Sequence, residues 1–357
     1  MRLPVLLIIV CSLNSSFGQQ NPVPGLPYVS PEKAGFDQNE IDHTINNIWA
    51  MPPGDFRGLV VIKDHELVIE EYFHTFWRIS IHDIRSAGKS VTALLMGIAM
   101  KDGLIKDLDQ DVYSLLPKEK YPTIHKDYQK ITLRHLLNMT SGLDADTDRP
   151  ETPGSAGNWI GLDDWKDYIL GISLASEPGE HWVYADINPL LIATVIEEKS
   201  GMSLKDYARE KLFDPLGITQ FYWYTNSANQ TGAAGNLYLS TLDFAKIGVL
   251  VANEGKWKNE QIVDPNFVKD LITTKVKGVS DWWNLADSYG FFWYKSTRTF
   301  GGKTFEYLFA SGNGGNQLIV IPEHEMVIAL TSSAYGQRYA QRRTYDIINR
   351  VLSAFNR

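Results

Sequence analysis

Short runs of apolar and β-branched residues near the start of the chain are typical of β-strands. Residues 58–63 and 67–72 form two such runs, and Asp64-His65 between them marks a tight hairpin turn. The preceding residues, 41–49, have a pattern compatible with a helix. The beginning of the chain therefore predicts a helix followed by a two-stranded hairpin.

Three further apolar runs lie near the end of the chain, at residues 305–310, 317–321 and 326–331. Residues 313–316, Asn-Gly-Gly-Asn, separate the first two runs, and such residues favour the backbone of a hairpin turn. We therefore expect consecutive antiparallel strands here, followed by a terminal helix.

The middle of the chain has mainly helical patterns and long polar loops. The clearest helix follows Ser86, where apolar residues recur at helical spacing up to Gly103. A second is predicted from Asn188, as N-cap, to Gly201, as the stop signal. Helices at this position suggest an insertion between the two groups of strands.

These patterns predict one α+β domain over residues 19–357. Its antiparallel sheet, flanked by helices, would form from both chain ends, in a sheet lobe of about 19–85 and 235–357. An all-helical lobe of about 86–234 would be inserted, and a site is expected in the cleft at the junction.

Ser86 and Lys89 are the candidate catalytic pair. On a helix, residues three apart project from the same face, so the lysine amine can reach the serine hydroxyl and activate it. The helix N-terminus favours developing negative charge on the serine, and burial favours a neutral lysine that can act as a base. Ser30 and Lys33 have the same spacing but lie in a Pro- and Gly-rich arm, where no buried helix is expected.

A Ser-Lys pair needs a third group that relays the proton to the leaving group. Tyr184 is the candidate, because it lies on the loop just before the helix predicted from Asn188, opposite the C-terminal strands. The alternative for any tyrosine is a packing role in a half-buried position.

Six segments, taken in order, resemble the serine β-lactamase, penicillin-binding protein and DD-peptidase superfamily. The resemblance is to its class C β-lactamase-related branch, which also holds esterases and 6-aminohexanoate-dimer hydrolases. It implies a β-lactamase/transpeptidase-like fold, acylation of Ser86, and acid and base roles shared by Lys89 and Tyr184. It also implies an oxyanion hole between the backbone N–H groups of Ser86 and Asn313. The segments are Ser86-Ala-Gly-Lys89 and residues 132–143, 178–186, 212–217, 289–293 and 311–317.

Two departures from the family pattern concern the substrate. Asp186 stands where the tyrosine motif often ends in asparagine; a carboxylate would bind a substrate N–H, hydroxyl or ammonium, or assist the following helix N-terminus. The Lys-Thr-Gly motif of lactamases and peptidases aligns with Ala310-Ser311-Gly312 or with residues 313–315, and neither offers a cation. Ser311 and Gly312 are expected to contact substrate.

The missing lysine argues against substrates with a carboxylate at that position, such as penicillins and D-alanyl-D-alanine ends. It favours esters and amides without that carboxylate as substrates. Arg85 and Arg134 could supply charge from elsewhere, although Arg85 also suits a structural ion pair.

The first 18 residues have the pattern of a secretory signal peptide. A positive start precedes residues 3–13, which are apolar but too few to span a bilayer. We expect cleavage after Gly18, a secreted or periplasmic protein, and no further membrane segment. Cys11 raises a lipoprotein alternative, which Val10 disfavours because a small residue normally precedes a lipidated cysteine.

Composition excludes several other classes of function. The net charge is −8, and the one basic cluster, Arg338, Arg342 and Arg343, is explained by a solvated helix face, so nucleic acid is not an expected partner. No metal-binding spacing occurs, and Asp83 replaces the first glycine that a phosphate-binding loop requires. No metal or cofactor is therefore expected.

The sequence thus predicts an exported serine hydrolase that cleaves an ester or amide bond of a small molecule or short peptide. The alternatives are a β-lactamase or DD-peptidase, and a sensor or binding module that is acylated without turnover. The oligomeric state stays open.

Overall fold

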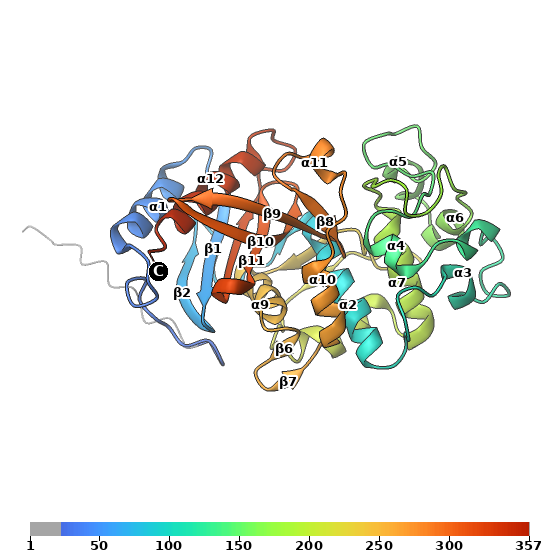
Figure 1. The fold of residues 1–357 in the computed structure, drawn as a ribbon, viewed down its shortest axis with the longest axis horizontal. Helices are drawn as coiled ribbons and strands as arrows, with labels where there is room; N and C mark the ends of the chain where they lie inside the picture. The colour runs from blue at the N-terminus through green and yellow to red at the C-terminus, as the bar shows by residue number, and fades with distance from the viewer. Residues whose placement is uncertain (1–22, 357) are drawn as a thin grey trace, which may run out of the picture.

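The computed structural model describes residues 23–356, so the predicted signal peptide and Cys11 lie outside the described residues. A seven-stranded antiparallel sheet forms the centre of one half of the molecule, in the order β2-β1-β12-β11-β10-β9-β8 (Figure 1). The strands are β1 (Phe56–Lys63), β2 (Glu66–Tyr72), β8 (Ser288–Gly290), β9 (Trp293–Phe300), β10 (Lys303–Gly312), β11 (Asn316–Ile321) and β12 (Met326–Ser332).

The two ends of the chain meet where β1 pairs with β12. Val60 lies opposite Ala329 in this antiparallel ladder, and β2 and β11 continue the sheet on either side. All five predicted strands are present, and the α+β class built from both chain ends is confirmed.

Turn chemistry sets the register of both predicted hairpins. Asp64 and His65 adopt left-handed φ values of 50° and 60° between β1 and β2. Gly314 and Gly315 have φ of 90° and 89° between β10 and β11, a conformation that costs glycine little.

Helices cover the sheet on both faces. Helix α9 (Thr241–Ala252) packs against β1, β11 and β12, where a Cβ on Gly248 would lie 2.5 Å from Val327 Cγ1. Helices α1 (Gln38–Ala50) and α12 (Ala340–Ser353) contact each other, and α12 crosses β9, β11 and β12 (Figure 1). The remaining elements on this side are α10 (Pro265–Thr273), α11 (Val279–Trp282), η4 (Pro322–His324) and the small hairpin β6 (Lys256–Trp257) and β7 (Glu260–Gln261).

The second half of the molecule is mainly helical. Its centre is the contact between α2 (Gly88–Lys101) and α7 (Ile187–Ser200), both almost entirely buried (Figure 1). Around them lie α3 (Val112–Leu115), η2 (Lys126–Gln129), α4 (Leu133–Leu137), α5 (Ala156–Trp159), α6 (Trp165–Leu170), α8 (Leu204–Ala208) and η3 (Arg209–Phe213).

A small three-stranded sheet lies at the junction of the two halves. Strand β5 (Leu237–Leu239) pairs with β4 (Tyr222–Trp223) on one side and with β3 (His82–Asp83) on the other. The helical half thus contributes one short strand, and the sheet anchors the chain just before Ser86.

The predicted N-cap role of Asn188 is wrong. The helix begins at Ile187, and Asn188 lies inside its first turn with no exposed surface. Its side chain accepts a hydrogen bond from Ser141 Oγ at 2.9 Å and contacts Met139 Sδ at 3.2 Å. A tertiary contact with the 139–141 loop, rather than helix capping, determines this position.

No helix within residues 23–356 is both long enough and apolar enough to span a membrane.

Candidate active site

Ser86 lies in a short 3-10 turn, η1 (Arg85–Ala87), that leads directly into α2. The backbone before it is held on both sides: Ile84 N donates to Leu237 O at 3.0 Å, and Arg85 N donates to Asp83 Oδ1 at 2.8 Å. Arg85 has a left-handed φ of 54°, which is strained for a residue with a side chain. This turn presents Ser86 at the entry to a buried helix.

Lys89 follows Ser86 by one helical turn, and only 1% of its surface is exposed. Its Nζ lies 3.1 Å from Ser86 Oγ, 2.6 Å from the carbonyl oxygen of Ala234 and 2.8 Å from Asp186 Oδ1. The structure therefore brings Ser86 and Lys89 together at the spacing expected for residues three apart on a helix.

The environment of Lys89 favours its charged form. Burial is the largest influence and opposes the charge, but the nearby Asp186 and Tyr184 together outweigh it, so the pKa of Lys89 is raised. The sequence-based expectation that burial makes Lys89 neutral is therefore wrong. Asp186, a residue expected to contact substrate, instead faces the ammonium.

Tyr184 lies beside this pair, on the loop that leads into α7. Its side chain is buried, and the centre of its ring is 4.9 Å from Lys89 Nζ. The backbone is fixed by a hydrogen bond from Thr147 N to Tyr184 O at 2.9 Å. On β9, burial, with a smaller contribution from Tyr184, raises the pKa of Tyr294 well above its ordinary value. Tyr294 is therefore a neutral hydroxyl group.

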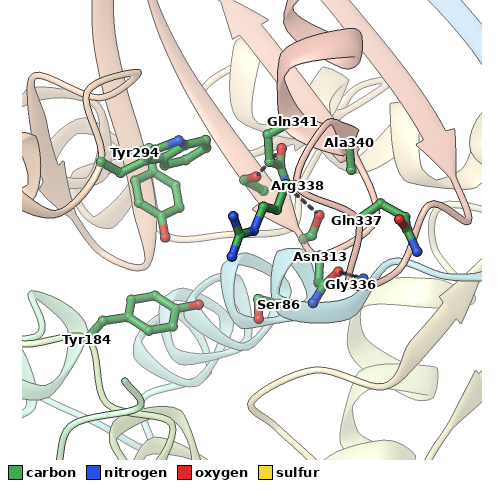
Figure 2. A pocket seen from close by; sticks show the side chains of 13 residues that line it. Ser86, Tyr184, Tyr294, Asn313, Gly336, Gln337, Arg338, Ala340 and Gln341 are labelled. Carbon is green, nitrogen blue, oxygen red and sulfur yellow. Dashed lines mark hydrogen bonds between the residues drawn. The ribbon is translucent and has the colours of Figure 1, made fainter. Parts of the chain in front are cut away.

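A pocket of about 460 Å³ opens above Ser86. Figure 2 shows Ser86 at its base, Tyr184 and Tyr294 on one side, and Gln337 on the other. The predicted residues Ser311, Gly312 and Asn313 line it, whereas Lys89 and Asp186 are not lining residues. The lining residues are Ser86, Tyr184, Trp283, Tyr294, Ser311, Gly312, Asn313, Gly314, Gly336, Gln337, Arg338, Ala340 and Gln341.

Gly312 allows the end of β10 to lie against the segment that carries Ser86. A Cβ at this position would be 1.9 Å from the carbonyl oxygen of Ile84, so no other residue fits without movement. Asn313 follows directly, and its side-chain oxygen accepts a hydrogen bond from Gly336 N at 2.8 Å. The turn after β12 is thereby tied to the rim of the pocket.

Helix α12 contributes pocket residues that no sequence pattern indicated. Gln341 Nε2 donates to Gly312 O at 2.9 Å, and Gln341 Oε1 accepts from Gln317 Nε2 at 2.9 Å and from Ser311 Oγ at 3.4 Å. Gln341 thus links α12 to the last residues of β10. Its place in the sequence gives no periodicity or motif that could have revealed this role.

Arg338 is exposed, as expected, but it lines the pocket and does not lie on the helix face to which the sequence pattern assigned it. It lies in the turn before α12, and that turn folds over the end of β10. The two arginines proposed as alternative cations are engaged elsewhere. Arg85 pairs with Asp83 at 3.1 Å and packs over Tyr335, while Arg134 pairs with Asp109 at 2.8 Å.

Histidine, cysteine and acidic side chains do not form a metal-binding group anywhere in residues 23–356.

Comparison with known proteins connects this geometry to a family. The family model described as Beta-lactamase matches residues 53–351. The chain is 34% identical to penicillin-binding protein 4* of Bacillus subtilis over 149 residues, which are 40% of this chain and 30% of that protein. It is 26% identical to the lovastatin esterase of Penicillium rubens over 240 residues, 53% of this chain and 59% of the esterase. The chain thus spans less than two thirds of either relative.

A solved structure extends the comparison over nearly the whole fold. The provisional 6-aminohexanoate-dimer hydrolase from Bacillus anthracis superposes with a TM-score of 0.69 at 19% identity. The superposition covers 93% of this chain and 89% of that one. At this level of identity, the similarity establishes a shared fold.

Proposed function

The chain belongs to the Beta-lactamase family of hydrolases, and from this premise we propose that it is a serine hydrolase that acylates Ser86. The substrate would be an ester or amide of a small molecule or short peptide. The names of two relatives support this proposal: one is an esterase and the other is a penicillin-binding protein.

The contact between Ser86 Oγ and Lys89 Nζ, at 3.1 Å, is the observation that carries this proposal. Ser86 lies at the base of the pocket, and Tyr184 reaches the same pocket from the loop before α7. A lysine or a tyrosine can take up the proton of the hydroxyl only from its own deprotonated form, so the reactive state is the one in which the Lys89 and Tyr184 pair has lost one proton.

In the acylation step, the Ser86 hydroxyl passes its proton to the Lys89 and Tyr184 pair as Oγ bonds to the substrate carbonyl carbon. The carbonyl oxygen becomes negative, and the backbone N–H groups of Ser86 and Asn313 stabilise it. The tetrahedral carbon then breaks its bond to the leaving group, which takes the proton from Tyr184. In deacylation, a water molecule gives a proton to the same pair as it bonds to the acyl carbon. The bond from that carbon to Ser86 Oγ then breaks, Oγ takes the proton back, and the acid is released.

Hydrolysis of a neutral p-nitrophenyl ester tests the proposal, with Ser86→Ala and Ser30→Ala compared under identical conditions. Ser30 has the same spacing to a lysine but is exposed and is not a lining residue of the pocket, so its substitution serves as a matched control. We expect steady turnover that Ser86→Ala reduces by about a thousandfold or more and Ser30→Ala leaves intact. Turnover that survives Ser86→Ala would refute the nucleophile. A single burst would instead support the acylatable sensor.

We also propose export of the protein. The supporting observation is the signal-like pattern of residues 1–18. N-terminal sequencing of the protein recovered from an expressing bacterial cell should give Gln19 as the first residue. Recovery of the uncleaved chain from the cytoplasm would contradict export.

A further inference from the structure

The pocket above Ser86 has a positive wall and no acidic one. Arg338 is the one lining residue with a formal charge at neutral pH, and none of the 13 lining residues is aspartate or glutamate. The protein as a whole has a net charge of −8. The positive charge of the pocket is therefore a local feature and does not follow from the overall charge.

The Arg338 side chain has no polar partner within the described chain. Between Val23 and Asn356, no hydrogen bond or ion pair holds its guanidinium. Nearby arginines differ: Arg343 donates to Pro52 O at 2.8 Å, and Arg85 pairs with Asp83. Figure 2 shows the Arg338 side chain reaching into the pocket, above Ser86 and toward Tyr294. Its charge is thus available to a ligand.

The start of α12 adds to the positive potential at the same place. This helix has 14 residues, and Ala340 at its first position lines the pocket. The side chain of the preceding Tyr339 does not cap the helix. The partial positive charge of the helix N-terminus therefore acts in the same direction as the Arg338 guanidinium.

We propose that the substrate carries a carboxylate, which Arg338 binds while the scissile carbonyl lies against Ser86. This inference rests on the proposed hydrolase function and defines its substrate class. The planar guanidinium can donate two parallel hydrogen bonds to a carboxylate. A single cation suits a monoanion better than a phosphate dianion.

The wall of the pocket across from Arg338 is aromatic and favours an apolar group on the substrate. Trp283 and Tyr294 line the pocket together and pack edge-on, with ring centres 5.0 Å apart. They offer an apolar surface across from Arg338. The substrate class is therefore an ester or amide with an apolar part and one carboxylate.

Arg338 provides the pocket with a cation, although the lysine that the family has on β10 is missing. The lysine position is occupied by Ala310, or by Asn313 in the other alignment, so neither supplies charge. The turn before α12 supplies a cation to the same pocket from a different element. Carboxylated substrates, which the missing lysine alone would disfavour, become the preferred class.

Two matched pairs of esters test this proposal. Mono-4-nitrophenyl glutarate and 4-nitrophenyl pentanoate differ by a carboxylate in place of a methyl group on the acyl side. The pair 4-acetoxybenzoate and 4-methylphenyl acetate differ in the same way on the leaving group. The quantity measured is the ratio of kcat/KM for the charged to the neutral member, in wild type, Arg338→Gln and Arg342→Gln. Arg342 is exposed, lies four residues along and is outside the pocket lining.

For at least one pair, we expect the wild-type ratio to exceed one and to fall about tenfold in Arg338→Gln, since a charge-assisted bidentate contact is lost. Arg342→Gln should keep the wild-type ratio. An unchanged ratio in Arg338→Gln for both pairs, or an equal fall in Arg342→Gln, would overturn the proposal.

A binding measurement separates this proposal from the hydrolase function. Quenching of tryptophan fluorescence reports binding of the two charged esters, mono-4-nitrophenyl glutarate and 4-acetoxybenzoate, to the Ser86→Ala variant, where no turnover is required. For at least one of them, we expect affinity to fall about tenfold when Arg338→Gln is added to Ser86→Ala, and much less for its neutral counterpart. Equal affinity in the single and double variants for both charged esters would overturn the carboxylate contact, even if the enzyme hydrolyses esters.

Discussion

At the scale of single residues, the buried ammonium of Lys89 controls the protonation of the site. A charge with 1% exposure requires a partner, and Asp186 provides one at 2.8 Å. Asparagine at position 186 would keep the shape of the side chain and remove its charge. The replacement of the family's asparagine by Asp186 therefore affects the protonation of Lys89 more directly than it affects contacts with the substrate.

Replacement of Asp186 by Asn should shift the pH dependence of hydrolysis. The pKa of Lys89 is raised in part by Asp186, so loss of the carboxylate lowers it. A neutral amine would then be available at lower pH, and the acidic limb of the kcat/KM profile should move down. Glu180→Gln, at an exposed position on the same loop, serves as the control. An unmoved limb in Asp186→Asn would contradict the coupling.

At the scale of elements, the site depends on the close approach of β10 to the turn before α2. The carbonyl oxygen of Ile84 occupies the space where a side chain at Gly312 would begin. The contact positions the backbone of Asn313 relative to that of Ser86, and Gln341 fixes the same strand from the opposite direction. The two proposed oxyanion donors are therefore placed by elements that are more than 200 residues apart.

Substitution of Gly312 by Ala tests this arrangement. The added methyl group must push β10 away from Ile84, which should lower the free energy of unfolding by about 1–3 kcal/mol. We expect a larger effect on kcat than on KM, because a displaced oxyanion donor weakens the transition state most. Gly157 has open space around its Cβ position and is exposed, so Gly157→Ala is the control. Normal kcat in Gly312→Ala would contradict the account, as would equal effects in the two variants.

At the scale of the whole molecule, a buried polar network ties the sheet to the site. His82 Nε2 lies 3.1 Å from Ser332 O and 2.9 Å from Tyr335 Oη, and Tyr335 donates to Asp83 O at 2.8 Å. The network connects β3, the end of β12 and the turn that carries Arg338. Burial is the main reason that the pKa of His82 is lowered to about 4.

This network predicts a loss of stability in mild acid. The unfolded chain takes up a proton on His82 near its ordinary pKa of about 6.5, whereas the folded chain does so only near pH 4. Stability is therefore lost as the pH falls through this interval, by on the order of 3 kcal/mol from His82 alone. Urea unfolding between pH 7 and pH 4 should show a smaller pH dependence in His82→Gln than in wild type. The exposed His43 provides the control His43→Gln. The same dependence in wild type and His82→Gln would contradict this assignment.

Local features account for what the sequence could predict. The strands of both hairpins follow from their residue patterns and from turns such as Asn-Gly-Gly-Asn, and Ser86 and Lys89 meet because they share one helix. Tyr184 was chosen for its position on the loop before a predicted helix, and the family resemblance then supported it, because the loop itself has no local signal for catalysis. Arg338 and Gln341 were missed because their positions depend on how the turn after β12 folds over β10. Asn188 was misassigned because tertiary contacts, which the local pattern does not contain, buried it.

If Ser86 is the nucleophile of a serine hydrolase, a reagent that phosphonylates activated serines should modify it. Labelling of the intact protein with a fluorophosphonate, followed by proteolysis and mass spectrometry, locates the reactive serine. We predict one stoichiometric adduct, mapped to Ser86 and reduced in Lys89→Ala. No adduct, or an adduct on another residue such as Ser30 or Ser90, would contradict this role of Ser86.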